Sequence, residues 1–304
     1  EIADRDWSSD VCSSDLSGSG KSTLAEVVAN CFGGRSEGYC DSFGGGDSIK
    51  RTIRVNQAPV GKTPRSTVVS YLGIFDEIRS LFAKTGAARK MKIGASLFSM
   101  NVKGGRCECC QGTGMQKIEL NYLPSTYIPC PECGGKRFNE KVLTVTYQGM
   151  TILDVLETPI FELTDVFKGD AKVHSVLSSM MELGLGYVRL GQMSMSLSGG
   201  EAQRIKLARA LGTPSHGRNL YILDEPTSGL NDADIEKFTK VLMSLQEKGD
   251  TIVIVEHNIE FVATVADHVI DFGLVSGDAG GKIVSQGAPA SVFSDELSSL
   301  YGLG

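Results

Sequence analysis

Two short motifs that lie close together constrain the fold of this chain more than any other part of its sequence. Residues 197–201 read Leu-Ser-Gly-Gly-Glu and have the features of a helix start: Ser198 is a good N-cap, and two glycines let a ligand approach the backbone. Helix-forming residues with apolar positions at helical spacing continue to Leu211. Because free backbone N–H groups at a helix start carry partial positive charge, we expect an anion to bind at Ser198, Gly199 and Gly200.

The second motif is a strand that ends in acidic residues. Residues 221–226 read Tyr-Ile-Leu-Asp-Glu-Pro, an apolar run closed by Asp224 and Glu225. Carboxylates in that place can hold a magnesium ion and a water molecule against a triphosphate. The two motifs together therefore predict a nucleotide site in an α/β fold.

A glycine-rich loop near the start of the chain supplies the third part of this site. The loop residues are Ser17, Gly18, Ser19, Gly20, Lys21, Ser22 and Thr23, the second half of a phosphate-binding loop. In such a loop, backbone N–H groups cradle the phosphates, Lys21 reaches the terminal ones and the Ser22 hydroxyl binds Mg²⁺. Apolar residues at helical spacing follow from Leu24 to Phe32, as expected for the helix after the loop.

The loop departs from the full pattern at position 15, where this chain has Asp15 in place of glycine. A carboxylate there repels phosphate, and aspartate adopts the left-handed conformation only at a cost. We therefore expect the chain to bind ATP poorly and Asp15→Gly to tighten nucleotide binding. A nucleotide titration of the two proteins checks this, and equal dissociation constants would contradict it.

The first sixteen residues do not fit the pattern that follows them. A phosphate-binding loop should follow a buried strand, yet residues 6–16 have neither alternation nor an apolar run. They match the translation of a common sequencing-library adapter. We therefore interpret residues 1–16 as a non-native leader that replaces the true upstream strand, which resequencing of the locus would test.

Paired cysteines form the second strong signal. Cys107-x-x-Cys110 and Cys130-x-x-Cys133 are separated by 19 residues, and glycines follow each pair. This spacing matches a structural zinc site of four thiolates, in which no coordination position is left for catalysis. Reduced cysteines without a metal are the alternative, and Cys109 is expected to be a spectator. Cysteines in this pattern suit a reducing compartment, so we expect a cytoplasmic protein.

Charge is distributed very unevenly along the chain. The net charge is −6, but residues 48–107 carry twelve Lys and Arg against two acids, whereas residues 221–304 carry fourteen acids against four lysines. Such a chain can present a polyanion-binding face, the alternative being solvated charge on several faces. The residues that we select as DNA contacts are Lys62, Arg65, Lys103, Arg106, Lys136 and Arg137. Tyr122 and Tyr127, between the cysteine pairs, either stack on bases or pack against the knuckles.

Further strands are predicted along the chain. Residues 52–56 form a short strand that delivers Gln57 to a loop, and residues 142–147 alternate as a strand. Residues 251–255 are continuously apolar, as a buried parallel strand requires, and Glu256 and His257 follow them. No stretch approaches the roughly 18 apolar residues of a membrane span, so we expect no membrane partner.

The loop at 17–23, the motif at 197–201 and the strand at 221–226 together resemble the ABC ATPases. An ABC core interrupted by Cys-x-x-Cys pairs is similar to the UvrA family, the first component of the bacterial ABC excinuclease. Residues 57–66, 102–108 and 187–204 strengthen this resemblance. It covers residue 17 to the C-terminus and corresponds to the second nucleotide-binding half of those proteins, so we expect the first half to be missing.

The resemblance implies an α/β fold: an ABC-type P-loop ATPase core with a helical signature lobe and an inserted zinc-binding module. The implied ATP-binding core is discontinuous, comprising residues 17–65 and 216–304. The signature domain spans residues 66–215 and contains the zinc module at 89–147.

The activity that the resemblance implies is ATP-dependent recognition of DNA damage in nucleotide excision repair. The expected cofactors are ATP, Mg²⁺ and Zn²⁺. The expected partners are double-stranded DNA, a UvrB-like helicase, and either a second ABC half or a second copy of the chain. The alternatives are the ATPase component of an ABC transporter and a UvrA-like paralogue that protects against DNA-binding drugs.

Roles for individual residues also come from the resemblance. ABC sites form head to tail, so Ser198, Gly199 and Gly200 are expected to bind a different ATP from the one at Lys21. In the site of Lys21, Asp224 and Ser22 would bind magnesium and Glu225 would orient the attacking water. His257 would contact the terminal phosphate, and Gln57 would report the nucleotide state to the helical lobe. With one half present, little ATPase activity is expected unless the chain self-associates.

Overall fold

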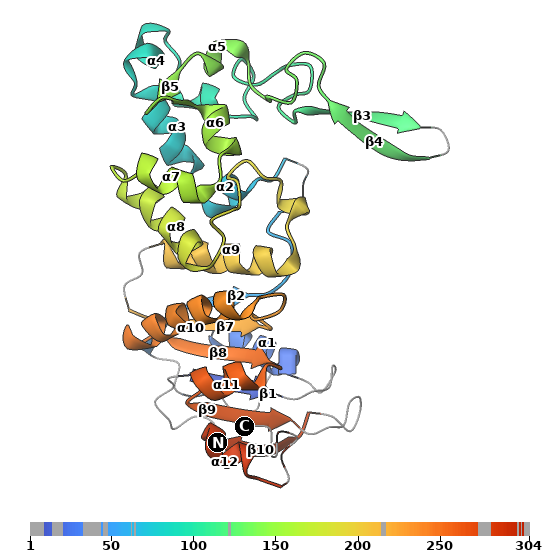
Figure 1. Ribbon diagram of the computed structural model, residues 1–304, viewed down its shortest axis with the longest axis vertical. Coiled ribbons are helices and arrows are strands. Elements are labelled where there is room, and N and C mark those ends of the chain that lie inside the picture. The colour runs from blue at the N-terminus through green and yellow to red at the C-terminus, as the bar shows by residue number, and fades with distance from the viewer. Residues whose placement is uncertain are drawn as a thin grey trace.

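A six-stranded sheet lies at one end of the molecule in the computed structural model (Figure 1). The residues that the structure describes are 9–13, 21–32, 44, 48–61, 63, 65–120, 123–213, 217–272, 281–296, 298 and 300. The strand order is β10-β9-β1-β8-β7-β2, and every pair is parallel except β10 with β9. The strands are β1 (Ser9–Ser13), β2 (Ile49–Val55), β7 (Arg218–Asp224), β8 (Thr251–Glu256), β9 (His268–Phe272) and β10 (Ile283–Gly287).

Helices cover both faces of this sheet. Helix α1 (Lys21–Phe32) packs Ala25 and Ala29 against one face, and α10 (Asp232–Glu247) and α11 (Ile259–Val265) cover the other. The short α12 (Pro289–Phe293) contacts β9 and β10. Because both faces of β7 and β8 are covered, these strands are buried at almost every position, which confirms the two predicted core strands.

Strand β1 corrects one expectation from the sequence. Residues 6–16 lack a strand pattern, yet Ser9–Ser13 pairs in parallel with β8 on one side and β9 on the other. In the middle of a sheet, both neighbours satisfy the backbone N–H and C=O groups, and this outweighs the absence of an apolar run. The interpretation of residues 1–16 as a non-native leader stays a prediction.

The other end of the molecule is helical. Its elements are α2 (Val68–Leu72), α3 (Phe75–Ala83), α4 (Gly86–Lys90), η2 (Ala95–Phe98), α5 (Glu140–Leu143), β5 (Thr146–Tyr147), β6 (Met150–Thr151), α6 (Ile152–Glu157), α7 (Ile160–Val166), α8 (Ala171–Glu182), η3 (Ser194–Ser196) and α9 (Gly199–Leu211). The fully buried rings of Phe82 and Phe167 each pack with Tyr147 at a centroid separation of 5.8 Å, and Phe82 also packs with the buried ring of Phe98 at 5.4 Å. The strand predicted at 142–147 is wrong in its first half, because Asn139 caps the short helix α5 there.

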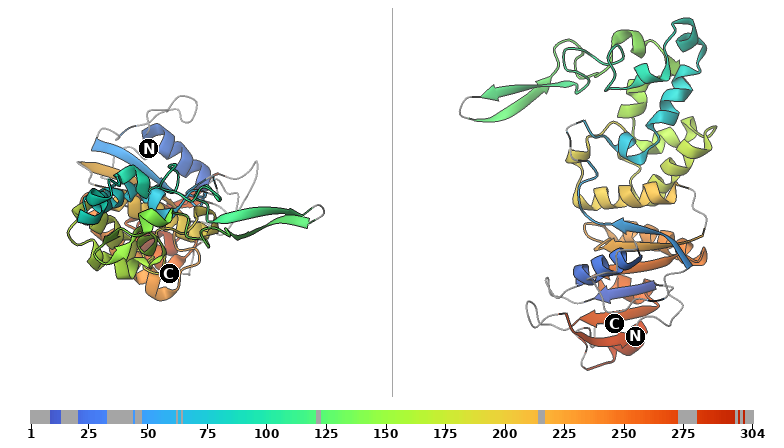
Figure 2. Two further views of the ribbon diagram at one scale, coloured as in Figure 1. Left: turned by 90° about the horizontal axis from the view of Figure 1, so that it is seen from above. Right: turned by 180° about the vertical axis from the view of Figure 1, so that it is seen from behind.

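A two-stranded hairpin projects sideways from this helical lobe. It consists of β3 (Met115–Leu120) and β4 (Leu123–Pro129), and the views from above and behind show it standing clear of the rest of the chain (Figure 2). Helix α9 lies between the helical lobe and the sheet (Figure 1). Within the described residues, no helix combines the length and the apolar character of a membrane span.

Candidate functional site

The nucleotide site begins with a serine and an aspartate brought together by the sheet. Ser22 lies in the first turn of α1 and Asp224 ends β7, and the Ser22 hydroxyl donates to Asp224 Oδ1 at 3.4 Å. Both are oxygen ligands of the kind that Mg²⁺ prefers, so this pair fits the expected ion. Burial, and next the charge of Glu225, raise the pKa of Asp224 above its usual value. A bound cation would stabilise the ionised carboxylate.

The loop that should hold the phosphates is described only at its end. Ser17, Gly18, Ser19, Gly20 and Asp15 lie outside the described residues. Lys21 is buried at the start of α1, whereas Ser22 and Thr23 are exposed beside it.

Glu225 follows the strand in an unusual backbone conformation. Its φ is +48°, in the left-handed region, and its N–H donates to the carbonyl of Val255 in β8 at 2.7 Å. That conformation costs a non-glycine residue roughly 1–2 kcal/mol. The bend directs the carboxylate away from the strand, where Oε1 lies 3.3 Å from His257 Nε2 and the side chain is 45% exposed. The structure thus brings Glu225 and His257 together from two strands.

The loops that carry these two residues share a buried anchor that sequence reasoning missed. Glu256 is 3% exposed and accepts backbone N–H groups from Thr227 at 3.1 Å, His257 at 2.9 Å and Asn258 at 3.3 Å. A buried carboxylate needs such donors. Its signal in the sequence was an acidic residue at the end of an otherwise apolar strand.

The signature helix α9 begins with a complete capping box. Ser198 Oγ accepts the Glu201 N–H at 3.2 Å, and Glu201 Oε2 accepts the Ser198 N–H at 2.8 Å. Tyr187 donates its hydroxyl to Glu201 Oε1 at 2.6 Å. Burial alone would raise the pKa of Glu201, but the hydrogen bonds from Tyr187 and Ser198 outweigh it and lower that pKa. Glu201 is therefore held ionised as a cap.

Helix α9 also contacts the nucleotide elements of its own chain. Gln203 donates to the carbonyl of Asp224 at 2.7 Å. A Cβ atom added at Gly199 would lie 3.1 Å from Gln57 Oε1, and one at Gly200 would lie 3.1 Å from the Ser228 carbonyl. The glycines thus permit a close approach of α9 to two loops at the end of the sheet.

Arg204 is a second unexpected feature of this region. It is 8% exposed, and its Nε and Nη1 find no hydrogen-bond partner among the described residues. Nη1 lies 3.6 Å from the position that a Cβ at Gly200 would occupy. A buried guanidinium without full partners is costly, so this corner of the signature favours an anionic ligand.

The four paired cysteines converge as their spacing predicts. The Sγ atoms of Cys107, Cys110, Cys130 and Cys133 all lie within 4.8 Å of one another. Cys107 and Cys130 are 3.9 Å apart and Cys110 and Cys133 are 3.7 Å apart. Thiolates at about 2.3 Å from a tetrahedral zinc ion are separated by about 3.8 Å, so the cluster fits that ion.

The surroundings of the cluster also suit a metal. The Gly114 N–H donates to Cys110 Sγ at 3.3 Å, which is the type of outer contact that orients a ligand. Backbone hydrogen bonding, first from Cys133, lowers the pKa of Cys130 to about 6 and so favours its thiolate. Burial raises the pKa of Cys107 to about 12, which disfavours its thiolate, and a bound cation would stabilise that thiolate. Cys109 is exposed and accepts from Gln116 Nε2 at 3.1 Å, outside the group of four.

The basic residues selected from the sequence divide into two groups. Arg65, Lys103 and Lys136 are exposed. Arg106 and Arg137 make contacts within the protein: Arg106 Nη2 lies 3.5 Å from Glu108 Oε2, and Arg137 Nη1 donates to the Gly191 carbonyl at 2.9 Å. Lys62 lies outside the described residues.

Tyr127 does not pack against the cysteine knuckles. It is 59% exposed on β4 and lines a cavity of about 700 Å³ at the base of the hairpin. Arg65 and Lys117 line the same cavity, together with Met115, Met193 and Met195. An exposed aromatic ring beside cations is suited to stacking on a base. Tyr122 lies outside the described residues.

Comparison with known proteins agrees with this site. A family model described as ABC transporter matches residues 114–228. UvrABC system protein A of Staphylococcus epidermidis is 45% identical over 284 residues, which is 91% of this chain and 30% of that protein. The protein of the same name from Thermus thermophilus is 48% identical over 283 residues, again 91% of this chain and 30% of its own length. The chain therefore spans about a third of the curated relatives that it matches.

Among solved structures, the chain matches the crystal structure of UvrA2 from Deinococcus radiodurans. The TM-score is 0.86 at 43% sequence identity, and the match covers 96% of this chain and 36% of that chain. The overall fold of this chain is thus shared with a solved protein.

Proposed function

Since this chain belongs to the UvrA family of ABC ATPases along 91% of its length, we propose that it supplies one nucleotide-binding half of a DNA-damage recognition protein in nucleotide excision repair. The observation that carries the proposal is the presence, in one chain, of the Ser22–Asp224 pair, which suits a nucleotide-bound magnesium ion, and of a four-cysteine cluster beside a projecting hairpin. The ATPase component of a transporter needs a nucleotide site but has no use for a cysteine cluster.

ATP hydrolysis in this proposal uses residues at the carboxyl edge of the sheet. Asp224 and Ser22 would hold Mg²⁺, which would neutralise charge on the phosphates. Lys21 binds the terminal phosphates, and His257 contacts the γ-phosphate. Glu225 orients the attacking water, and its contact with His257 keeps the carboxylate beside that phosphate. Gln57 lies next to Gly199 and can transmit the nucleotide state to α9.

The second half of each ATP site comes from a signature. Ser198, Gly199 and Gly200 bind the nucleotide held by another ABC half, which is either a further ABC half or a second copy of this chain. The partial positive charge at the start of α9 supports an anion at this place, and so do Arg204 Nε and Nη1, which have no hydrogen-bond partner among the residues that the structure describes.

The cysteine cluster has a structural role in this proposal. Cys107, Cys110, Cys130 and Cys133 would hold a zinc ion, which would fix the loops from which the hairpin projects. DNA would bind along the exposed cations near these loops. Contacts to phosphates, with readout of DNA shape, suit the recognition of chemically diverse lesions. A UvrB-like helicase receives the lesion afterwards.

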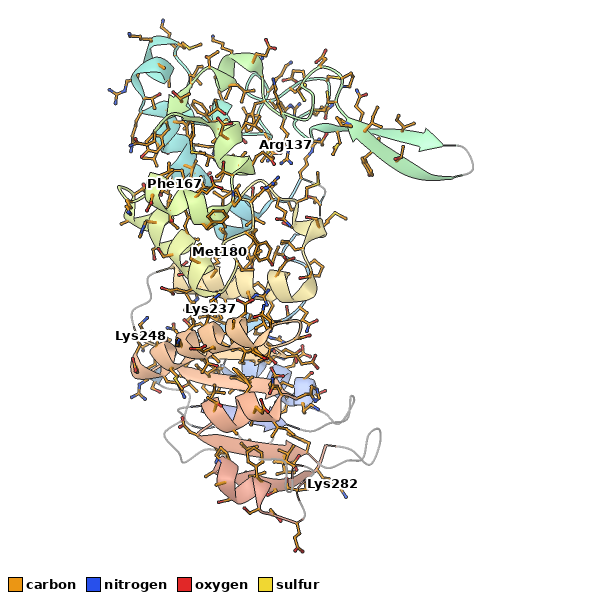
Figure 3. The ribbon with its side chains drawn as sticks, viewed as in Figure 1. Arg137, Phe167, Met180, Lys237, Lys248 and Lys282 are labelled. Atoms are coloured by element: carbon orange, nitrogen blue, oxygen red, sulfur yellow. The ribbon has the colours of Figure 1, made fainter. Side chains whose placement is uncertain are left out.

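Removal of exposed cations should weaken DNA binding in a salt-dependent way. Each phosphate contact contributes about −0.9 to the slope of log K against log salt, so Lys103→Ala combined with Lys136→Ala should make the slope shallower by about 1.8. The assay is fluorescence anisotropy on a duplex with and without one bulky adduct, from about 50 to about 300 mM salt. Lys248→Ala, an exposed lysine at the sheet end, is the matched control (Figure 3). A flat salt dependence of the unaltered chain would remove the DNA-binding claim.

A further inference from the structure

Arg137 physically joins the cysteine cluster to the segment that leads into the signature helix. At its cluster end, the Arg137 carbonyl accepts the N–H of Cys107 at 2.8 Å. The residue itself follows Cys133 by four positions and has a φ of +67°, in the left-handed region. Its main chain is therefore part of the loops that hold the four thiols.

The side chain of Arg137 runs in the opposite direction, into the helical lobe (Figure 3). Nη1 donates to the Gly191 carbonyl at 2.9 Å, and Nη2 lies 3.7 Å from Glu157 Oε1. The side chain is 14% exposed. A guanidinium in this position has its donors directed at protein acceptors, which leaves it poorly placed to bind a phosphate.

The segment that receives Arg137 is fixed on its other sides by backbone hydrogen bonds. The Gly191 N–H donates to the Leu156 carbonyl at 2.7 Å, and the Gln192 carbonyl accepts from Val68 at 3.0 Å. The Ser194 N–H then donates to the Ser66 carbonyl at 2.8 Å. Ser198, the cap of α9, follows four residues later.

Gly191 has no room to shift toward α6. A Cβ atom at this position would lie 2.8 Å from the Leu156 carbonyl oxygen, closer than real contacts allow. Close packing against Leu156 therefore leaves Gly191 little freedom to move toward α6 when the contact with Arg137 changes.

We propose that Arg137 is a positioning residue through which the metal-bound cysteine cluster sets the conformation of residues 191–198, and with it the signature at Ser198–Gly200. The inference rests on the proposed metal and nucleotide sites. It assigns Arg137 a role inside the protein, in place of the DNA contact expected from the sequence. Arginine suits this role because one planar group reaches a carbonyl and a carboxylate together and stays charged when buried.

Hydrogen exchange measured by mass spectrometry on the peptide covering residues 187–204 tests the proposal without DNA or ATP. In the unaltered chain, chelation of zinc should raise exchange in this peptide by about tenfold, the effect of losing one charged hydrogen bond. Arg137→Ala should raise the exchange of this peptide by a similar factor while zinc is still bound. Chelation of zinc from Arg137→Ala should then raise the exchange little further, because the substitution and the chelation break the same linkage. Lys141→Ala, which removes an exposed lysine of α5 with no proposed binding role, should behave as the unaltered chain.

Zinc content from elemental analysis, measured on each sample, separates the outcomes. Normal exchange in Arg137→Ala with zinc bound overturns the proposal. If Arg137→Ala loses zinc, the deciding variant is Arg137→Lys, because lysine keeps the positive charge and the aliphatic stem but reaches only one of the two acceptors. Raised exchange in Arg137→Lys with zinc retained supports the linkage. Loss of zinc from Arg137→Lys overturns it. An unaltered chain that binds no zinc overturns the metal site itself, whereas failure to bind DNA or ATP leaves this measurement unaffected.

Discussion

Glu225→Gln should lower the rate of ATP turnover by about 10²–10³-fold while nucleotide binding is retained. The amide is nearly the same size as the carboxylate, but it cannot accept a proton from the attacking water. Glu225 is the acidic side chain that the left-handed turn after β7 directs out of the strand, 3.3 Å from His257. Loss of its charge therefore affects the hydrolytic step and leaves Lys21 and Ser22 in place.

The rate should be measured in single turnover, in the Asp15→Gly background and over a range of protein concentrations that includes self-association. Glu236→Gln is the matched control, because Glu236 is an exposed glutamate on α10 that pairs with Lys240 at 2.6 Å. A fall of less than about threefold in the Glu225 variant, with the control unchanged, would mean that another group orients the water.

Cys130→Ser should reduce bound zinc from one ion per chain to none under mild chelation. Zinc held by four thiolates contributes about 10–16 kcal/mol, so removal of one ligand should cost about 3 kcal/mol, or on the order of a hundredfold in affinity. Cys130 is 1% exposed and its Sγ lies 3.9 Å from that of Cys107, so a hydroxyl there leaves a tetrahedral site incomplete.

Cys109→Ser provides the control for that experiment. Cys109 lies between two of the proposed ligands in sequence, but it is exposed and contacts Gln116 instead. The Cys109→Ser variant should retain its zinc fully, as measured by elemental analysis after competition with a chelator of known affinity. Equal zinc loss in both variants would show that the four-cysteine assignment is wrong.

The parts of the fold that could be predicted from sequence are those in which local pattern and burial agree. β7 and β8 are apolar because helices cover both faces of the sheet, and α9 begins at Ser198 because its capping box lies within four residues. The cysteine cluster follows from spacing alone, since four thiols in two close pairs have few other uses.

The parts that could not be predicted depend on distant contacts. Ser9–Ser13 becomes a strand because two strands from the far end of the chain provide its hydrogen bonds. The directions of Arg106 and Arg137 depend on acceptors such as Glu108 and Gly191, so charge counts cannot separate them from exposed Lys103. Glu256 was missed because its three donors come from backbone groups that the sequence does not mark.

The buried Glu256 carboxylate has a consequence for how the chemistry is prepared. One of its donors, Thr227, lies two residues after Glu225, and the other two donors are His257 and Asn258. A single buried carboxylate therefore holds both the loop that carries Glu225 and the loop that carries His257. If Glu225 orients the attacking water and His257 contacts the phosphate, as proposed, Glu256 would hold the two groups in place before a nucleotide binds. The fold itself would then supply the preorganisation that hydrolysis needs.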